Sequence, residues 1–100
     1  MKIILVCSAG MSTSMLVNKM RKSAEERGLE ASIDAVAESQ LKNNLEGTDV
    51  VLIGPQVRFL EKKIRALVEP KGIQTDIIDQ IAYGMMKGDV VLDQAIALKK

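Results

Sequence analysis

The chain has 100 residues and carries 14 Lys or Arg against 13 Asp or Glu, for a formal net charge of +1. This balance, together with only two aromatic residues, Phe59 and Tyr83, leaves neither a basic stripe nor stacking side chains for nucleic acid, which we do not expect as a partner. The length predicts a single domain over residues 1–100 with one aliphatic core.

Cysteine and histidine usage restricts the chemistry further. Cys7 is the only cysteine, so no internal disulfide can form, and His, the commonest metal ligand, is absent. We therefore expect no metal site and no bound cofactor. The four aliphatic residues that follow Met1 and Lys2 are too few for the core of a signal peptide, and no apolar run approaches the roughly 20 residues of a membrane span. The sequence thus predicts a cytoplasmic protein that does not insert into the membrane.

The first half of the chain predicts two strands and two helices. An aliphatic run predicts a strand over about residues 2–7, and a helix follows the loop after it. One face of that helix carries apolar residues at helical spacing: Leu16, Met20 and Ala24. Gly28 is well placed to end it. Residues 30–36 alternate between apolar and polar side chains, as in an edge strand, and residues 38–45 predict a short helix that stops near Gly47.

The second half repeats this alternation. Residues 50–53 form the most apolar run and predict a central strand. A third helix is indicated by apolar residues that share one helical face: Val57, Leu60, Ile64 and Leu67. We expect a fourth strand over residues 75–78, a loop over residues 79–88, and a last helix that begins near Asp89. The inward face of that helix carries three apolar residues: Val91, Ala95 and Leu98.

Alternating strands and helices predict an α/β fold, a small doubly wound, four-stranded parallel sheet with helices on both faces. Right-handed crossovers, with the alternating second strand at the edge, give the strand order 2-1-3-4. In this order the winding reverses between the first and third strands, and the crevice lies between the loops that follow them. Gly54, Pro55 and Gln56 would then lie beside the loop that follows Cys7.

Cys7 stands where the first strand gives way to a loop of small and hydroxyl-bearing residues. The start of the next helix carries roughly half a positive charge and unpaired N–H groups, so this turn favours a thiolate and an anion. Gly10 would permit close approach of the backbone. A structural explanation is also open, because free cysteine is often buried and packs as a small apolar side chain.

Three segments of the sequence resemble one known family. They are Cys7–Ser14 after an aliphatic strand, Val51–Gln56 at the end of the third strand, and Tyr83–Gly84 before the last helix. From Lys2 to its C-terminus the chain is similar to the IIB component of the lactose/cellobiose/chitobiose class of the bacterial sugar phosphotransferase system. The fold of that family, a four-stranded parallel sheet with helices on both faces, agrees with the predicted fold.

The resemblance implies that the chain is a phosphocarrier. The cysteine at the position of Cys7 would accept phosphate from a phosphohistidine of the IIA component and pass it to a sugar that the IIC membrane component imports. The resemblance leaves cellobiose, chitobiose and lactose open as the sugar. We expect IIA and IIC as partners, and a monomer when the chain is isolated.

The loop would hold the transferred phosphoryl group with backbone N–H groups and side-chain hydroxyls. The candidate phosphate-binding residues are Ser8, Ala9, Gly10, Met11, Ser12, Thr13 and Ser14. Candidates for the rim of the site are Pro55, Gln56 and Tyr83. Tyr83, with Met85 and Met86 after it, either lines this rim or packs into the core beneath the loop. Arg58 and Lys62 either meet acidic groups of a partner or form a solvated face.

Two other functions remain open. The first is a small cysteine-dependent phosphatase, a class of enzyme with a similar strand, cysteine loop and helix. The similar phosphatases have a Cys-x5-Arg pattern, whereas the sixth residue after Cys7 in this chain is Thr13. Without the arginine fork, phosphate hydrolysis loses its main electrostatic support, which suits a carrier that must keep its phosphate. A non-enzymatic anion-binding module would use the same loop without a covalent step, and detection of a phosphocysteine would distinguish it from a carrier.

Overall fold

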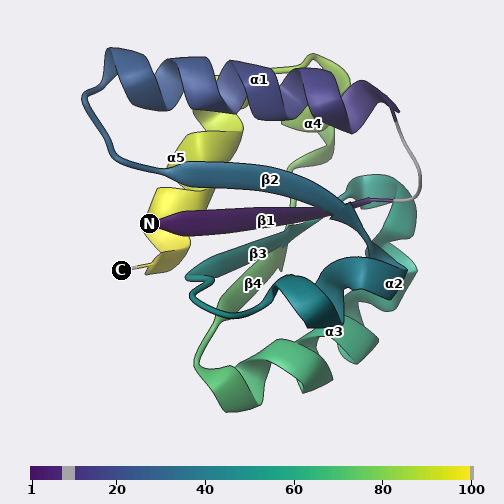
Figure 1. Cartoon of the computed structure of the whole chain (residues 1–100). Helices are drawn as coiled ribbons and strands as arrows, with labels where there is room; N and C mark the ends of the chain where they lie inside the picture. The colour runs from purple at the N-terminus through teal and green to yellow at the C-terminus, as the bar shows by residue number, and fades with distance from the viewer. Residues whose placement is uncertain (8–10, 100) are drawn as a thin grey trace.

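The computed structural model describes residues 1–7 and 11–99 (Figure 1). One parallel sheet contains four strands: β1 (Lys2–Cys7), β2 (Ser32–Ala37), β3 (Val50–Ile53) and β4 (Gln74–Ile77). Their order is β2-β1-β3-β4, which confirms the predicted topology. Because all the strands run in one direction, their carboxyl ends meet at the same edge of the sheet.

Helices cover both faces of the sheet (Figure 1). One face carries α1 (Met11–Glu26), α4 (Gln80–Gly84) and α5 (Gly88–Lys99), and the other carries α2 (Glu38–Leu41) and α3 (Glu61–Val68). Short 3-10 turns complete the chain: η1 (Lys42–Asn44), η2 (Pro55–Leu60) and η3 (Glu69–Lys71). Among the residues described, none of these helices is long and apolar enough to cross a membrane.

Strand β1 is buried on both of its faces. Ile3 and Leu5 pack into the layer formed with α1 and α5, whereas Ile4 and Val6 pack into the layer formed with α2 and α3. Each of the four side chains is at most 1% exposed. This double burial explains why β1 is continuously apolar from Ile3 to Val6, since neither face of this part of the strand meets water.

Helix α1 follows the predicted pattern. Its predicted inward residues are all buried: Leu16, Met20 and Ala24. Gly28 lies just after the helix with φ +66°, a left-handed conformation that glycine adopts without steric cost. The backbone N–H of Gly28 donates to the carbonyl of Glu25 at 3.1 Å, and that of Leu29 donates to the carbonyl of Ala24 at 2.9 Å. These two bonds satisfy carbonyls that the end of the helix would otherwise leave unpaired.

The prediction of a continuous loop over residues 79–88 is wrong, because α4 lies within that segment. The carboxylate of Asp79 accepts a hydrogen bond from the backbone N–H of Ala82 at 3.0 Å and so caps the start of the helix. Ala82 is the one buried residue of α4. A helix of five residues is too short to leave an apolar period in the sequence, which is why the pattern did not predict it.

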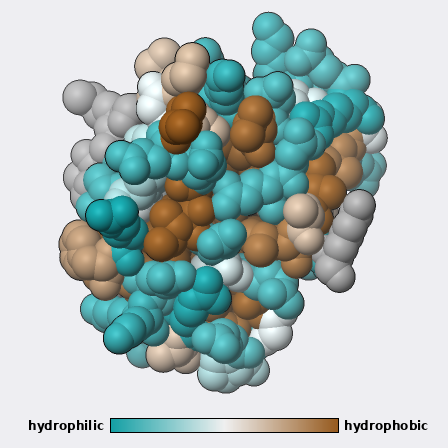
Figure 2. Space-filling model, turned by 180° about the vertical axis from the view of Figure 1, so that it is seen from behind, coloured by the Kyte–Doolittle hydropathy of each residue, from teal (hydrophilic) through white to brown (hydrophobic). Residues whose placement is uncertain are grey.

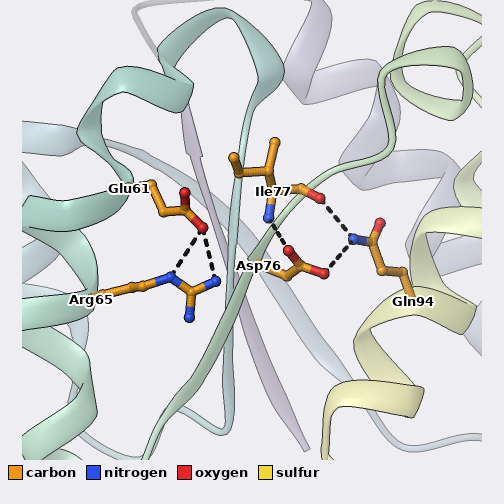
Figure 3. Close-up of polar contacts among 5 residues, drawn as sticks. All are labelled: Glu61, Arg65, Asp76, Ile77 and Gln94. Carbon is orange, nitrogen blue, oxygen red and sulfur yellow. Dashed lines mark hydrogen bonds and ion pairs between the residues drawn. The ribbon is translucent and has the colours of Figure 1, made fainter.

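The third predicted helix consists of two parts, η2 and α3. Val57 has φ −121° and ψ 24°, outside the helical region, so the chain bends before α3 begins. Val57 and Ile64 are still buried in the same core, as the spacing predicts. Within α3, Nε and Nη2 of Arg65 both donate to Oε2 of Glu61, at 3.0 and 2.8 Å (Figure 3). This i,i+4 pair supports the helix on its solvent side.

Candidate functional site

Cys7 is the last residue of β1, and its backbone pairs with Ala37 of β2. The next described residue, Met11, is the first of the 16-residue helix α1. The strand, the short connection and the helix therefore follow in the predicted order, with the positive end of the α1 dipole at the carboxyl edge of the sheet. Four predicted phosphate-binding residues form the first turn of α1: Met11, Ser12, Thr13 and Ser14. The other three lie outside the described residues: Ser8, Ala9 and Gly10.

The end of β3 lies directly beside the end of β1. The backbone N–H of Gly54 donates to the carbonyl of Val6, the residue before Cys7, at 2.8 Å. A Cβ atom on Gly54 would lie 3.2 Å from this carbonyl oxygen and 2.8 Å from Oε1 of Gln56. Glycine is therefore suited to this position by the close approach of a neighbouring strand and of the Gln56 carboxamide, a reason that the sequence does not reveal.

The three predicted rim residues come together in one pocket. Pro55 and Gln56 reach it from η2, and Tyr83 reaches it from α4. The pocket has a volume of about 520 Å³, and Arg58, Gln80 and Gly84 complete its lining. Nε2 of Gln56 donates a hydrogen bond to the hydroxyl oxygen of Tyr83 at 2.7 Å. The segments that follow β3 and β4 are thus joined by side chains at the carboxyl edge of the sheet.

A set of hydrogen bonds from α5 holds the start of α4 in place. Nε2 of Gln94 donates to the carbonyl of Ile77 at 2.7 Å and to Oδ2 of Asp76 at 3.3 Å (Figure 3). Oε1 of Gln94 accepts from the backbone N–H of Asp79 at 3.2 Å. The Gln94 carboxamide therefore bonds to a backbone carbonyl and a backbone N–H at the end of β4, as the backbone of a neighbouring strand would. Sequence reasoning missed this residue, because one glutamine on an amphipathic helix carries no signal of such a contact.

Large apolar side chains are exposed on the segments that begin at this edge. Among the described residues, five such side chains follow β1, β3 or β4: Met15, Phe59, Ile81, Met85 and Val90. Phe59 is the most exposed of them, at 77%. In contrast to Met85, both Tyr83 and Met86 are partly buried against the core that contains α1 and α5. Figure 2, the rear view, shows apolar groups as separate patches divided by polar side chains.

A carboxylate with a perturbed pKa lies at the opposite edge of the sheet. Asp49 precedes β3, at the amino edge of the sheet, and its carboxylate accepts hydrogen bonds from Nζ of Lys99 and from the backbone N–H of Lys2, both at 2.8 Å. These bonds, that of Lys99 above all, lower the pKa of Asp49. The described part of the chain contains no cluster of three His, Cys, Asp or Glu side chains that could hold a metal ion.

Comparison with known proteins gives a consistent result. Residues 2–94 match the family model described as "PTS system, Lactose/Cellobiose specific IIB subunit". The chain is 44% identical over 97 residues to the oligo-beta-mannoside-specific EIIB component of Bacillus subtilis, which covers 97% of this chain and 94% of that protein. It is 45% identical over 98 residues to the galactose-specific EIIB component of Lactococcus lactis subsp. cremoris, with 93% of this chain and 91% of that protein covered.

A solved structure and a longer relative extend the comparison. The cellobiose-specific phosphotransferase IIB component from Borrelia burgdorferi has a TM-score of 0.81 and 47% identity, covering 98% of this chain and 90% of that one. The lactose-specific EIICB component of Lacticaseibacillus casei is 25% identical over 93 residues, which are 91% of this chain but only 16% of that protein. In this last relative the similar segment is a small part of a much longer polypeptide.

Proposed function

The chain belongs to the lactose/cellobiose-specific IIB family of the sugar phosphotransferase system, and we propose that Cys7 is the residue that carries its phosphate. A IIB component is a phosphotransferase component, so the reaction class follows from the family. The observation that supports Cys7 is its place at the carboxyl end of β1, between the start of α1 and the end of β3. This is the switch point of a doubly wound sheet, where ligands bind.

The proposed reaction has two phosphoryl transfers. In the first, the Cys7 thiolate attacks phosphorus on the phosphohistidine of IIA, so that an S–P bond forms, the N–P bond breaks and the imidazole keeps the electron pair. In the second, the oxygen of a sugar hydroxyl bound to IIC attacks the same phosphorus, so that an O–P bond forms and the S–P bond breaks. The electron pair of the S–P bond returns to the Cys7 thiolate, and the hydroxyl proton passes to solvent. Because phosphoryl transfer depends mainly on positioning and charge stabilisation, the site needs donors around the phosphoryl oxygens more than it needs an acid or a base.

We assign the donors to the segment that joins β1 and α1. It offers backbone N–H groups at the start of a helix, and four of its residues add side-chain hydroxyls. The proposed phosphate-binding residues are Ser8, Ala9, Gly10, Met11, Ser12, Thr13 and Ser14. Backbone N–H groups carry only partial positive charge, so they can hold a phosphoryl group without neutralising it as an arginine would. Thr13 stands where the similar phosphatases have arginine. This composition favours storage of the phosphate on Cys7 over its hydrolysis.

The partners in this proposal are IIA as donor and the IIC membrane component as acceptor complex, with the chain acting in the cytoplasm as one domain over residues 1–100. The longer EIICB relative supports the association with IIC. Relatives at similar identity are named for oligo-beta-mannoside, galactose and cellobiose. Because similar IIB chains are named for different sugars, we assign the choice among cellobiose, chitobiose and lactose to IIC. We expect the isolated chain to be monomeric.

Phosphorylation of Cys7 can be tested directly. After incubation with phosphorylated IIA, intact-mass and peptide mass spectrometry should find one phosphoryl group, on Cys7. Cys7→Ser should lose this label and keep the circular dichroism spectrum of the parent. Ser32→Ala, a change at an exposed serine at the start of β2 and outside the site, should keep the label. Equal labelling of Cys7→Ser would falsify the assignment. Turnover of p-nitrophenyl phosphate by the parent protein would instead indicate a phosphatase.

A further inference from the structure

The carboxamide of Gln56 is held in one orientation although the residue is exposed. Its Nε2 donates to the hydroxyl oxygen of Tyr83 at 2.7 Å, and its Oε1 lies against Gly54, 2.8 Å from the position that a Cβ atom would take there. Gly54 in turn is bonded to the carbonyl of Val6. The amide therefore folds back from η2 toward the strand end that leads into Cys7. An exposed glutamine normally samples many rotamers, so this arrangement needs an explanation.

The partner that orients the amide is itself well anchored. Tyr83 lies on α4, whose first turn is capped by Asp79. The backbone N–H of Asp79 donates to Gln94 of α5, which also binds the carbonyl of Ile77. The body of Tyr83 packs partly against the core beneath. A chain of contacts thus runs from α5 through α4 to the Gln56 carboxamide and fixes its place at the carboxyl edge of the sheet.

A primary amide has two N–H donors, and the bond to Tyr83 uses one of them. The second has no partner among the residues that the structure describes. We infer that this second N–H donates to an oxygen of the phosphoryl group while it is transferred to and from Cys7, and that Tyr83 is a positioning residue for Gln56. The inference rests on the proposed function of Cys7. It adds a side-chain donor from η2, the turn that follows β3, to the backbone donors of the β1–α1 segment.

The chemistry of an amide suits this role. The three peripheral oxygens of the transferred phosphoryl group carry its negative charge, and preorganised neutral donors stabilise that charge in the transition state. A neutral amide adds a hydrogen bond without the full charge of the guanidinium of Arg58, which lines the same pocket. The phosphate is therefore positioned and remains transferable, as a carrier requires.

The test compares two glutamines of the same pocket. Gln56→Met removes the amide and keeps the length of the side chain, and Gln80→Met makes the same change at an exposed position on α4 for which no side-chain bond is seen. In single-turnover transfer from phosphorylated IIA, Gln56→Met should lower the rate at saturating IIA roughly hundredfold to thousandfold, by analogy with the loss of one oxyanion donor. The IIA concentration at half-maximal rate should not change. Gln80→Met should match the parent in both.

The ³¹P resonance of phosphocysteine gives a readout that does not depend on turnover. It should shift in Gln56→Met and stay in place in Gln80→Met, because only the first change removes a donor to the phosphoryl oxygens. Tyr83→Phe keeps the ring packing and removes only the acceptor of the Gln56 bond, and Gly54→Ala pushes the amide away with a new methyl group. Both should reproduce part of the Gln56→Met loss, and Tyr83→Phe should do so with little change in the thermal midpoint.

The outcomes separate this inference from the proposed function. If the parent is not phosphorylated on Cys7, the proposed function fails. If the parent is phosphorylated on Cys7 but Gln56→Met transfers as fast as Gln80→Met, with an unshifted ³¹P resonance, the role of Gln56 is overturned. If Gln56→Met unfolds, Tyr83→Phe and Gly54→Ala decide the question, and parent-like rates and resonances in both overturn the inference.

Discussion

A methyl group at Gly88 should strongly disturb the packing of α5 on α1. Gly88 is the first residue of α5 and is buried. A Cβ atom there would lie 2.6 Å from the carbonyl carbon of Lys19 and 2.7 Å from both the Cβ of Lys19 and the backbone nitrogen of Met20. Two of these three atoms belong to the α1 backbone, so no side-chain rotation can relieve the contact. Gly88→Ala therefore requires α1 and α5 to separate.

The cost of this separation can be worked out from the distances. Ordinary contact begins near 3.4 Å, so the helices must move apart by about 0.8 Å. Both helices contribute fully buried side chains to one core, among them Met20 and Leu92, whose contacts would loosen. Overpacking of a core costs typically about 1–3 kcal/mol. The better helix propensity of Ala offsets at most about 1 kcal/mol of this, and less at the first position of a helix.

We therefore expect Gly88→Ala to lower the free energy of unfolding by roughly 1–3 kcal/mol, which corresponds to a fall in Tm of roughly 5–20 °C for a domain of this size. Gly84→Ala is the matched control, because a Cβ atom there has no heavy atom within 4 Å and the φ of Gly84 is not positive. It should be neutral or stabilising by up to about 1 kcal/mol. Urea titration and thermal melting followed by circular dichroism measure both. A Gly88→Ala protein as stable as Gly84→Ala would refute the reasoning.

Two further predictions concern buried polar groups and pH. The hydroxyl of Thr75 is buried without a partner among the described residues, whereas that of Thr48 donates to a backbone carbonyl at 3.0 Å. Thr75→Val should stabilise the fold by up to about 1 kcal/mol and Thr48→Val should destabilise it by about 1 kcal/mol, as urea midpoints will show; equal effects would contradict this account. Because the bonds from Lys99 and Lys2 lower the pKa of Asp49 in the folded state, their stabilisation is present above the unfolded value of about 3.9 and is lost as the pH falls through the folded pKa. Asp49→Asn should thus be less stable than the parent at pH 7 and closer to it at pH 2, and an unchanged difference between the two pH values would exclude the role of this carboxylate.

Much of the fold is determined by local sequence patterns. Strand β1 is continuously apolar from Ile3 to Val6 because both its faces are covered, and α1 repeats buried residues at helical spacing until Gly28 takes a positive φ. Such signals depend on neighbours within a few positions along the chain, so the sequence alone predicts the four strands, their order and the place of Cys7. The resemblance of residues 7–14 to the IIB family is a local signal of the same kind.

The surroundings of Cys7 depend on residues that are far apart in the sequence. Gln56 and Tyr83 are separated by 27 positions, and their hydrogen bond exists because η2 and α4 start at the same edge of the sheet. Helix α4 itself is too short to produce a helical repeat of apolar residues in the sequence, and its position depends on Gln94 of α5. Gln56 and Tyr83 are candidates for the rim from the sequence alone, but no pattern in the sequence indicates the hydrogen bond between them or the contacts of Gln94.

Gly54 and Gly88 show the same difference between what the sequence indicates and what the tertiary structure determines. Their importance comes from the atoms that they face, the Val6 carbonyl for Gly54 and the α1 backbone for Gly88, and in both cases the facing atoms belong to another element. A sequence marks each glycine only as a turn or a helix start. The tertiary structure decides which of them can accept a methyl group, because steric contact is set by the distance between packed elements and not by the neighbours along the chain.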